Sequence, residues 1–171
     1  MRKISSHYYL RPDGEFGKRP IIQLDDEGCI ISVYEAGDNF KEETSLEYYP
    51  GIIIPGFVAS IRDENSGDVR KVKARAKANG VLRIKENTNV LSSDDYICAW
   101  HSLLKYEKTG NVLFSLKNYL SEHTVKAAQI LGEREWGVIC EGARPGILVL
   151  QNIDLRSFTL RPNSSFRLIQ K

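Results

Sequence analysis

Residues 48–58 read Tyr-Tyr-Pro-Gly-Ile-Ile-Ile-Pro-Gly-Phe-Val, and this stretch decides the fold that we predict for the chain. Two Pro-Gly pairs, which are typical of turns, bracket three isoleucines, whose β-branched side chains favour strands. We therefore expect a turn at Pro50-Gly51, a short buried strand over Ile52–Ile54, and a second turn at Pro55-Gly56.

Short apolar runs predict β-structure at both ends of the chain. Before residue 48 we expect an antiparallel meander of strands over 3–10, 18–24 and 29–34, with Ile31 and Val33 on one face. Towards the other end, turn-forming residues separate four apolar runs, at 136–140, 147–153, 158–160 and 166–169. The two ends therefore share one β pattern.

The middle of the chain is more charged and has helical periodicity. We predict a helix over 69–79, a strand over 81–84, a helix over 92–108 that a capping box opens, and one or two helices over 114–131. Ser66 or Asp68 can cap the first of these helices and Gly80 can end it. A second helix within 114–131 would start at Ser121, and Gly132 would end it. The predicted order is β, α, β.

Composition limits the classes of function. The chain has 171 residues, which suffices for one domain with a full core, and its net charge of +2 with a pI near 8.4 calls for neither nucleic acid nor an anionic membrane. We interpret Cys29, Cys98 and Cys140 as reduced, buried packing residues. Residues 1–7 lack the apolar core of a signal peptide, and no apolar run reaches the roughly 20 residues of a membrane span. We expect a soluble, cytoplasmic protein.

Three segments carry a resemblance to a known family. The sequence Pro55-Gly56-Phe57-Val58 resembles the point where, in metal-dependent hydrolases of the amidohydrolase superfamily, a small β-sandwich leads into a (β/α)8 barrel through Pro-Gly-Phe-Val/Ile-Asn-x-His-x-His. Residues 123–132 resemble the last barrel helix of that family, and residues 142–150 resemble its C-terminal hairpin. The resemblance covers about the first 58 and the last 50 residues.

The resemblance implies a mainly β fold with α-helices, of the α+β class. Residues 1–58 and 133–171 would form a composite β-sandwich domain built from the N-terminal and C-terminal segments. Residues 59–132 would be a central, mostly helical insertion that is a remnant of the barrel, because a complete barrel alone needs about 250 residues.

The metal motif of that family is missing from this sequence. Ala59 takes the place of the Asn, while Ile61 and Asp63 take the places of the two histidines that bind the catalytic metal. Ile61 cannot bind a metal, and a lone carboxylate such as Asp63 is more often a solvated loop residue. Asp63, His101 and His123 are the weak candidates for a zinc site if the chain is a hydrolase, and we favour structural roles for both histidines.

We predict a non-catalytic protein, without a cofactor, that acts as a binding or oligomerisation module. The helices are rich in apolar side chains that could cover a homodimer interface or a protein partner; these are Trp100, Leu103, Leu104, Phe114, Leu116 and Tyr119. The first alternative is a divergent metal-dependent hydrolase that acts on carbon-nitrogen bonds.

The second alternative is contact with nucleic acid through a basic helix. Five cations fall within eight residues: Arg70, Lys71, Lys73, Arg75 and Lys77. No aromatic residue lies among them to stack on bases, so we favour a solvated helix face.

Overall fold

A computed structural model gives the structure of the protein and describes all residues except 38–43, 63–68, 87, 89, 109–114 and 171. The strands are β1 (Arg2–Leu10), β2 (Phe16–Lys18), β3 (Pro20–Leu24), β4 (Ile30–Glu35), β5 (Leu46–Pro55), β6 (Phe57–Ile61), β7 (Val81–Glu86), β8 (Ile147–Asp154) and β9 (Thr159–Gln170). The helical segments are α1 (Val69–Ala78), α2 (Asp94–Ile97), α3 (Ala99–Lys108), α4 (Leu116–Ser121), a π-helical segment η1 (Glu122–Lys126) and α5 (Ala127–Ile130). None of the described helices is long and apolar enough to cross a bilayer.

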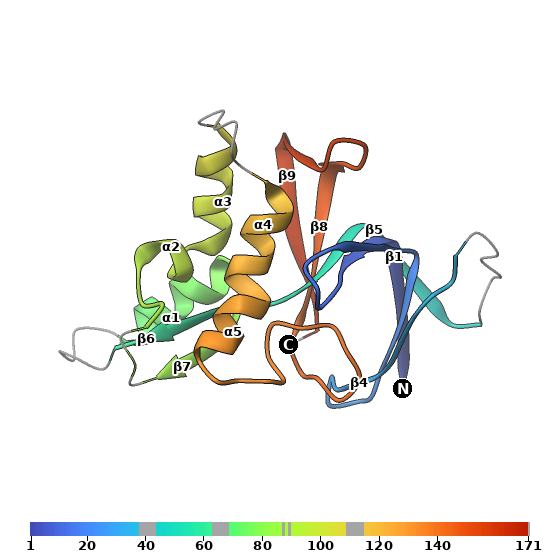
Figure 1. The fold of residues 1–171 in the computed structure, drawn as a ribbon, viewed down its shortest axis with the longest axis horizontal. Coiled ribbons are helices and arrows are strands. Elements are labelled where there is room, and N and C mark those ends of the chain that lie inside the picture. The colour runs from blue at the N-terminus through green and yellow to red at the C-terminus, as the bar shows by residue number, and fades with distance from the viewer. Residues whose placement is uncertain (38–43, 63–68, 87, 89, 109–114, 171) are drawn as a thin grey trace.

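The large sheet is assembled from both ends of the chain. Its strand order is β4-β3-β1-β5-β8-β9, and β2 pairs with the end of β1 (Figure 1). The C-terminal strand β8 pairs with β5 in antiparallel register, so that Ile52 lies opposite Leu150. The predicted α+β class and the composite β domain are confirmed.

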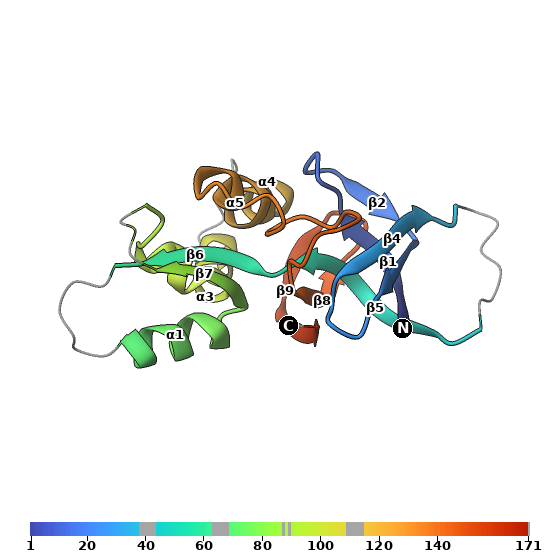
Figure 2. The same cartoon turned by 90° about the horizontal axis from the view of Figure 1, so that it is seen from below.

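A small parallel sheet follows directly along the chain. Gly56 alone separates β5 from β6, and its backbone N–H donates to the Gly146 carbonyl at 3.0 Å. β6, α1 and β7 form a β-α-β unit in which both strands run parallel. α1 lies on one side of the small sheet of β6 and β7, whereas α4 and α5 lie on the other side (Figure 2). The predicted turn at Pro55-Gly56 is therefore the point where the chain passes from one sheet to the next.

The predicted turn at Pro50-Gly51 is wrong, because β5 runs straight through both residues. The pairing of β1 with β5 shifts register between Ser6 and Tyr8, so that Pro50 and Gly51 form a bulge in β5 opposite the single residue His7. Gly51 has φ +134°, and a Cβ there would overlap the Leu150 carbonyl oxygen. The glycine thus permits a close approach of two strands instead of a reversal.

The predicted meander is confirmed as β1, β3 and β4, and β5 does not continue it. Residues 20–24 pair with both β1 and β4 in antiparallel register, whereas β5 lies parallel to the other edge of β1. The chain passes from β4, on one side of the β3–β1 pair, to β5, on the other side. The edge of β5 that faces away from β1 then pairs with β8. Ile31 is exposed, since a bulge in β4 turns Ile30 into the core in its place.

Two predictions for the C-terminal third are also corrected. Residues 136–140 form bends and irregular backbone rather than a strand, because Gly137 and Gly142 adopt positive φ and the segment folds over the core of the β domain. The predicted break over 161–164 does not end the strand, since β9 continues through it as a wide bulge opposite Asn152. The Ser164 hydroxyl holds this bulge by donating to the Asn152 carbonyl at 2.8 Å.

The first helix and the strand after it are confirmed as α1 and β7. The helix predicted over 92–108 is interrupted at Cys98, and Ser93 makes no side-chain capping bond, so the capping box is wrong. Asn79 explains the interruption, because its main-chain and side-chain oxygens accept from the N–H groups of Trp100 at 3.3 Å and His101 at 3.0 Å. Those contacts satisfy the first turn of α3 and begin the helix anew.

The segment 116–130 is one continuous helix whose hydrogen-bonding pattern changes. η1 begins at Glu122, directly after the predicted restart at Ser121, and the helical dihedral angles continue across the join. Ser115 caps its start and Gly132, with φ +74°, ends it. One hydrophobic cluster joins these helices to the large sheet, and a second fills the β domain. The predicted domain boundaries at residues 58 and 133 stay a prediction.

Candidate functional site

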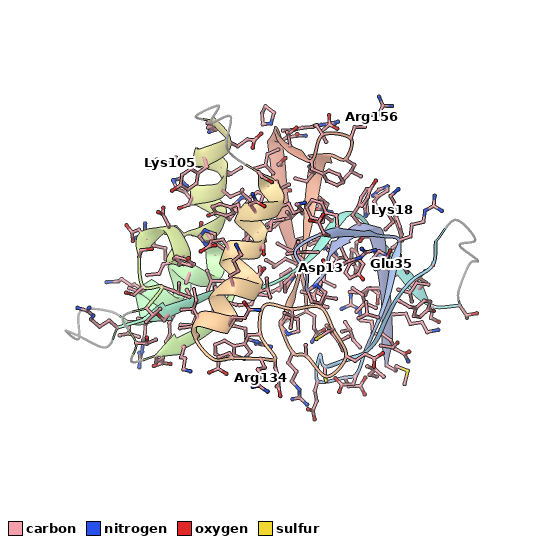
Figure 3. The ribbon with its side chains drawn as sticks, viewed as in Figure 1. Asp13, Lys18, Glu35, Lys105, Arg134 and Arg156 are labelled. Atoms are coloured by element: carbon pink, nitrogen blue, oxygen red, sulfur yellow. The ribbon has the colours of Figure 1, made fainter. Side chains whose placement is uncertain are left out.

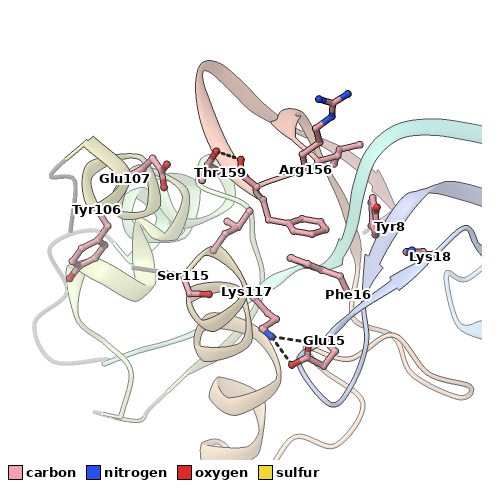
Figure 4. A pocket seen from close by; sticks show the side chains of 14 residues that line it. Tyr8, Glu15, Phe16, Lys18, Tyr106, Glu107, Ser115, Lys117, Arg156 and Thr159 are labelled. Carbon is pink, nitrogen blue, oxygen red and sulfur yellow. Dashed lines mark hydrogen bonds and ion pairs between the residues drawn. The ribbon is translucent and has the colours of Figure 1, made fainter. Parts of the chain in front are cut away.

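A cleft of about 990 Å3 opens where the large sheet meets the helices (Figure 4). Its walls are the hairpin between β1 and β2, the end of α3, the start of α4, and the turn between β8 and β9. We call it the junction cleft. Pockets of this size at the meeting of two structural units commonly hold small molecules.

Aromatic rings form the apolar floor of the junction cleft. Phe16 and Phe158 stack with their ring centroids 4.6 Å apart, and Tyr8 packs edge-on against Phe158 at 5.1 Å. Leu116 from α4 is buried beside them. The floor therefore joins three segments that lie far apart in the sequence.

Two aspartate-centred turns place the stacked phenylalanines. The Asp13 carboxylate accepts from the Glu15 N–H at 2.9 Å, just before Phe16. The Asp154 carboxylate accepts from the N–H of Arg156 at 2.9 Å in the turn that precedes Phe158. These are Asx-turns, which fold the chain back sharply. Phe158 has φ +53°, a conformation that is unfavourable for a bulky residue and that its ring packing must stabilise.

Charged side chains line the rim. Lys117 binds both carboxylate oxygens of Glu15, at 2.6 and 2.8 Å, and so ties α4 to the hairpin (Figure 4). Lys18 and Arg156 lie on the rim without an ion pair among the described residues, and Glu107 adds one carboxylate. Two uncompensated cations against one carboxylate favour a ligand with negative charge.

The positions predicted for a metal are not brought together. Asp63 lies outside the described residues. Ala59 and Ile61, which replace the Asn and the first His of the family motif, are buried in β6. His101 is exposed on α3, and its backbone N–H donates to the Asn79 side-chain oxygen at 3.0 Å.

His123 is buried in η1 between aromatic rings. Its ring stacks on Tyr119 at 4.1 Å and packs against Tyr96 at 4.4 Å, and its Nδ1 has no hydrogen-bond partner. We call these three residues the tyrosine–histidine stack. Burial lowers the pKa of His123 to about 4, although Glu122 and Asp95 act in the opposite direction.

These donors do not fit a zinc site. The rings of Tyr119 and Tyr96 pack against His123, and among the residues that the structure describes no three His, Cys, Asp or Glu side chains gather as a metal-binding group. Zinc needs three or four converging donors. No step of any reaction is therefore assigned to a metal in this chain.

Most of the side chains predicted for a partner are used within the chain. Leu103 is buried in the core, Tyr119 is buried with its hydroxyl donating to the Ala99 carbonyl at 2.7 Å, and Trp100 packs edge-on against Phe166 at 5.3 Å. Leu116 lines the floor of the junction cleft, and Leu104 is half-buried. Phe114 lies outside the described residues. The homodimer or protein partner stays a prediction.

The basic helix is α1, on the outside of the small sheet (Figure 2). Arg70, Lys71, Arg75 and Lys77 are exposed along it. Lys73 forms an ion pair with Glu86 at 2.5 Å, and Arg75 lies 3.6 Å from Asp94. Contact with nucleic acid stays a prediction.

No protein-family model matches the chain, and no curated protein matches its sequence. Solved structures match parts of it. An N-acetyl-D-glucosamine-6-phosphate deacetylase from Mycobacterium smegmatis is 14% identical with a TM-score of 0.35, over 49% of this chain and 25% of that chain. An amidohydrolase from Brucella melitensis is 12% identical with a TM-score of 0.32, over 84% and 26%. An N-acyl-D-glutamate deacylase from Bordetella bronchiseptica, complexed with zinc and a phosphonate inhibitor, is 19% identical with a TM-score of 0.33, over 48% and 17%.

This chain resembles amidohydrolases over part of its length. The chain spans about a quarter of the length of the deacetylase and of the amidohydrolase. Because the TM-scores are below 0.5, the activities of these proteins are not assigned to this chain. Its function has to be inferred from its own residues.

Proposed function

We propose that this protein is a non-catalytic binding protein whose junction cleft takes a small ligand with an aromatic or apolar body and an anionic group. The observation that carries the proposal is the pairing of an aromatic floor with uncompensated cations on the rim.

The floor supplies the apolar part of the binding free energy. The stacked rings of Phe16 and Phe158 present a flat surface, on which a planar ligand ring can pack in offset or edge-on geometry. Burial of apolar area from both partners yields roughly 25 cal/mol per Å2 before the cost of association. Affinity should therefore depend on Phe158 more than on any rim residue.

The rim selects the charge of the ligand. Arg156 and Lys18 can donate to an oxyanion, and the hydroxyls of Ser157 and Thr159, which are 2.8 Å apart, add weaker polar groups. The ion pair of Lys117 with Glu15 is already satisfied, so its role is to hold the cleft open between α4 and the hairpin. An amine of the same shape should bind more weakly than a carboxylate.

Calorimetric titration with 2-naphthoate and with 2-naphthylmethylamine tests this proposal. Saturable binding of the carboxylate should weaken about tenfold or more in Phe158→Ala and several-fold in Arg156→Gln. Leu168→Ala and Arg134→Gln, which change exposed residues away from the cleft, are the matched controls and should bind as the parent does. Equal affinity for the amine and the carboxylate would contradict the charge selection.

Turnover tests the non-catalytic part. The protein should release no acid from N-acylated amino acids when it is incubated with them in the presence of added zinc. Release that grows with protein concentration and disappears in His123→Phe would show that the hydrolase alternative is correct.

A further inference from the structure

The junction cleft carries its unpaired charges on opposite walls. Glu107 lies near the end of α3, on one side of the cleft (Figure 4). Lys18, at the end of β2, and Arg156, in the turn between β8 and β9, lie on the side of the large sheet, across from Lys105 and the rest of α3 (Figure 3). A ligand that fills the cleft therefore meets a carboxylate on one wall and cations on the other.

Glu107 is the carboxylate on the described walls that keeps its charge for a ligand. The other carboxylate, that of Glu15, is neutralised by Lys117, whose Nζ lies 2.6 Å from its Oε1. Glu107 is half-buried and has no ion pair among the described residues, so solvent screens its charge less than that of a fully exposed group. Tyr106, beside it on α3, also lines the cleft, and the face of an aromatic ring attracts an ammonium group. This wall therefore favours a cation.

The aromatic floor lies between the two walls. Phe16 reaches it from β2, and Phe158 stacks against Phe16 from the turn between β8 and β9, with the ring centroids 4.6 Å apart. A planar ligand that packs on these rings has one end towards α3 and the other end towards Lys18 and Arg156. The cleft can therefore bind the two ends of one ligand with opposite charges.

We infer that the junction cleft binds an aromatic amino acid whose ammonium and carboxylate groups lie at opposite ends of its ring system. This inference rests on the proposed function and adds a second charge to the ligand. A simple carboxylate leaves Glu107 unpaired, with a charge of the same sign as that of the ligand, whereas a dipolar ligand pairs the charges on both walls. An ordinary α-amino acid cannot do so, because both of its charges are attached to one carbon.

Calorimetric titration with three naphthoates tests the inference. 6-(Aminomethyl)-2-naphthoate should bind at least about threefold more tightly than 2-naphthoate, because its ammonium gains a half-buried carboxylate partner. 6-(Hydroxymethyl)-2-naphthoate has a similar size without the positive charge and should bind as 2-naphthoate does. Glu107→Gln should remove the gain that the ammonium gives. This variant should bind 2-naphthoate at least as tightly as the parent does, which shows that its cleft is intact.

Two controls separate the role of Glu107 from a general effect of charge. Glu141→Gln removes an exposed carboxylate that does not line the cleft, and the gain from the ammonium should persist in this variant. An equal loss there would overturn the inference. 3-(2-Naphthyl)alanine, which carries both charges on one carbon, should show no gain over 2-naphthoate. A gain as large as that of the dipolar naphthoate would mean that the cleft favours any zwitterion, and it would overturn the end-to-end arrangement.

The inference and the proposed function can fail separately. Saturable binding of 2-naphthoate with no gain from the ammonium would overturn this inference alone, and so would a gain that persists in Glu107→Gln. Absence of saturable binding for all three naphthoates would overturn both.

Discussion

Replacement of His123 by phenylalanine should remove a pH dependence from the stability of the fold. The wild-type imidazole is buried in the tyrosine–histidine stack with its Nδ1 unpaired, and burial lowers its pKa from 6.5 to about 4. Above pH 6.5 the ring is neutral in the folded and the unfolded chain, so the full stability is present. As pH falls from 6.5 to about 4, the unfolded chain takes up a proton that the folded chain refuses, and stability is lost.

The size of the effect follows from the pKa difference. Each pKa unit corresponds to about 1.4 kcal/mol, so the wild type should lose about 3 kcal/mol between pH 6.5 and pH 4 through this residue alone. Phenylalanine keeps the ring between Tyr119 and Tyr96, and as a swap of similar volume it should change stability at pH 7 by less than about 1.5 kcal/mol. The gap between the variant and the wild type should therefore widen in favour of the variant as pH falls.

Urea unfolding at pH 7, 6, 5 and 4, followed by tryptophan fluorescence, measures this gap. His101→Gln is the matched control, because His101 is exposed and its loss should leave the wild-type profile intact. A constant difference between His123→Phe and the wild type over the whole range would refute the reasoning, since it would mean that the buried imidazole takes up its proton without cost.

Three further substitutions test individual contacts. Gly51→Ala should destabilise the fold by more than about 3 kcal/mol in urea titrations, because the added Cβ meets a carbonyl of β8 at φ +134°; a loss below about 1 kcal/mol would contradict the close approach. Tyr119→Phe should cost about 1–2 kcal/mol by removing the buried bond to the Ala99 carbonyl, and unchanged stability would contradict that bond. The pKa of Glu47 is lowered to about 2, chiefly by the hydrogen bond from Arg2. The Tm of the wild type in thermal melts should therefore fall between pH 4.5 and 2. The matching loss of unfolding free energy should be less than about 1 kcal/mol, because this pair is half-exposed. Glu47→Gln should lose that part of the acid response, and an identical response would exclude the pair as its source.

Local sequence patterns predicted those parts of the fold that depend on neighbouring residues. The helical periodicity of residues 69–79 correctly predicted α1, and Gly80 and Gly132 correctly predicted where two helices end. The apolar runs correctly predicted β1 and β8. The failures were non-local. Nothing near Pro50-Gly51 shows that the bulge and the strand β8 will hold these residues extended, and nothing near Ser93 shows that Asn79 will begin α3.

The candidate sites were missed for the same reason. Phe16 and Phe158 come from segments that lie far apart in the sequence and meet only in the folded structure. One local signal was available, since Asp13 and Asp154 each precede a turn that presents a phenylalanine. A search for paired Asx-turns would have found both halves of the aromatic floor.

The pairing of Ile52 with Leu150 has a consequence for how the chain is synthesised. β5 leaves the ribosome long before β8, so its outer edge stays open while the whole helical segment is made. The β6–α1–β7 unit, whose contacts are short in sequence, can form in that interval, whereas the large sheet must wait for the last strands. We expect a nascent chain stalled before β8 to expose that edge to other chains. Pairing of β8 with β5 covers the edge and so protects the finished protein from aggregation through it.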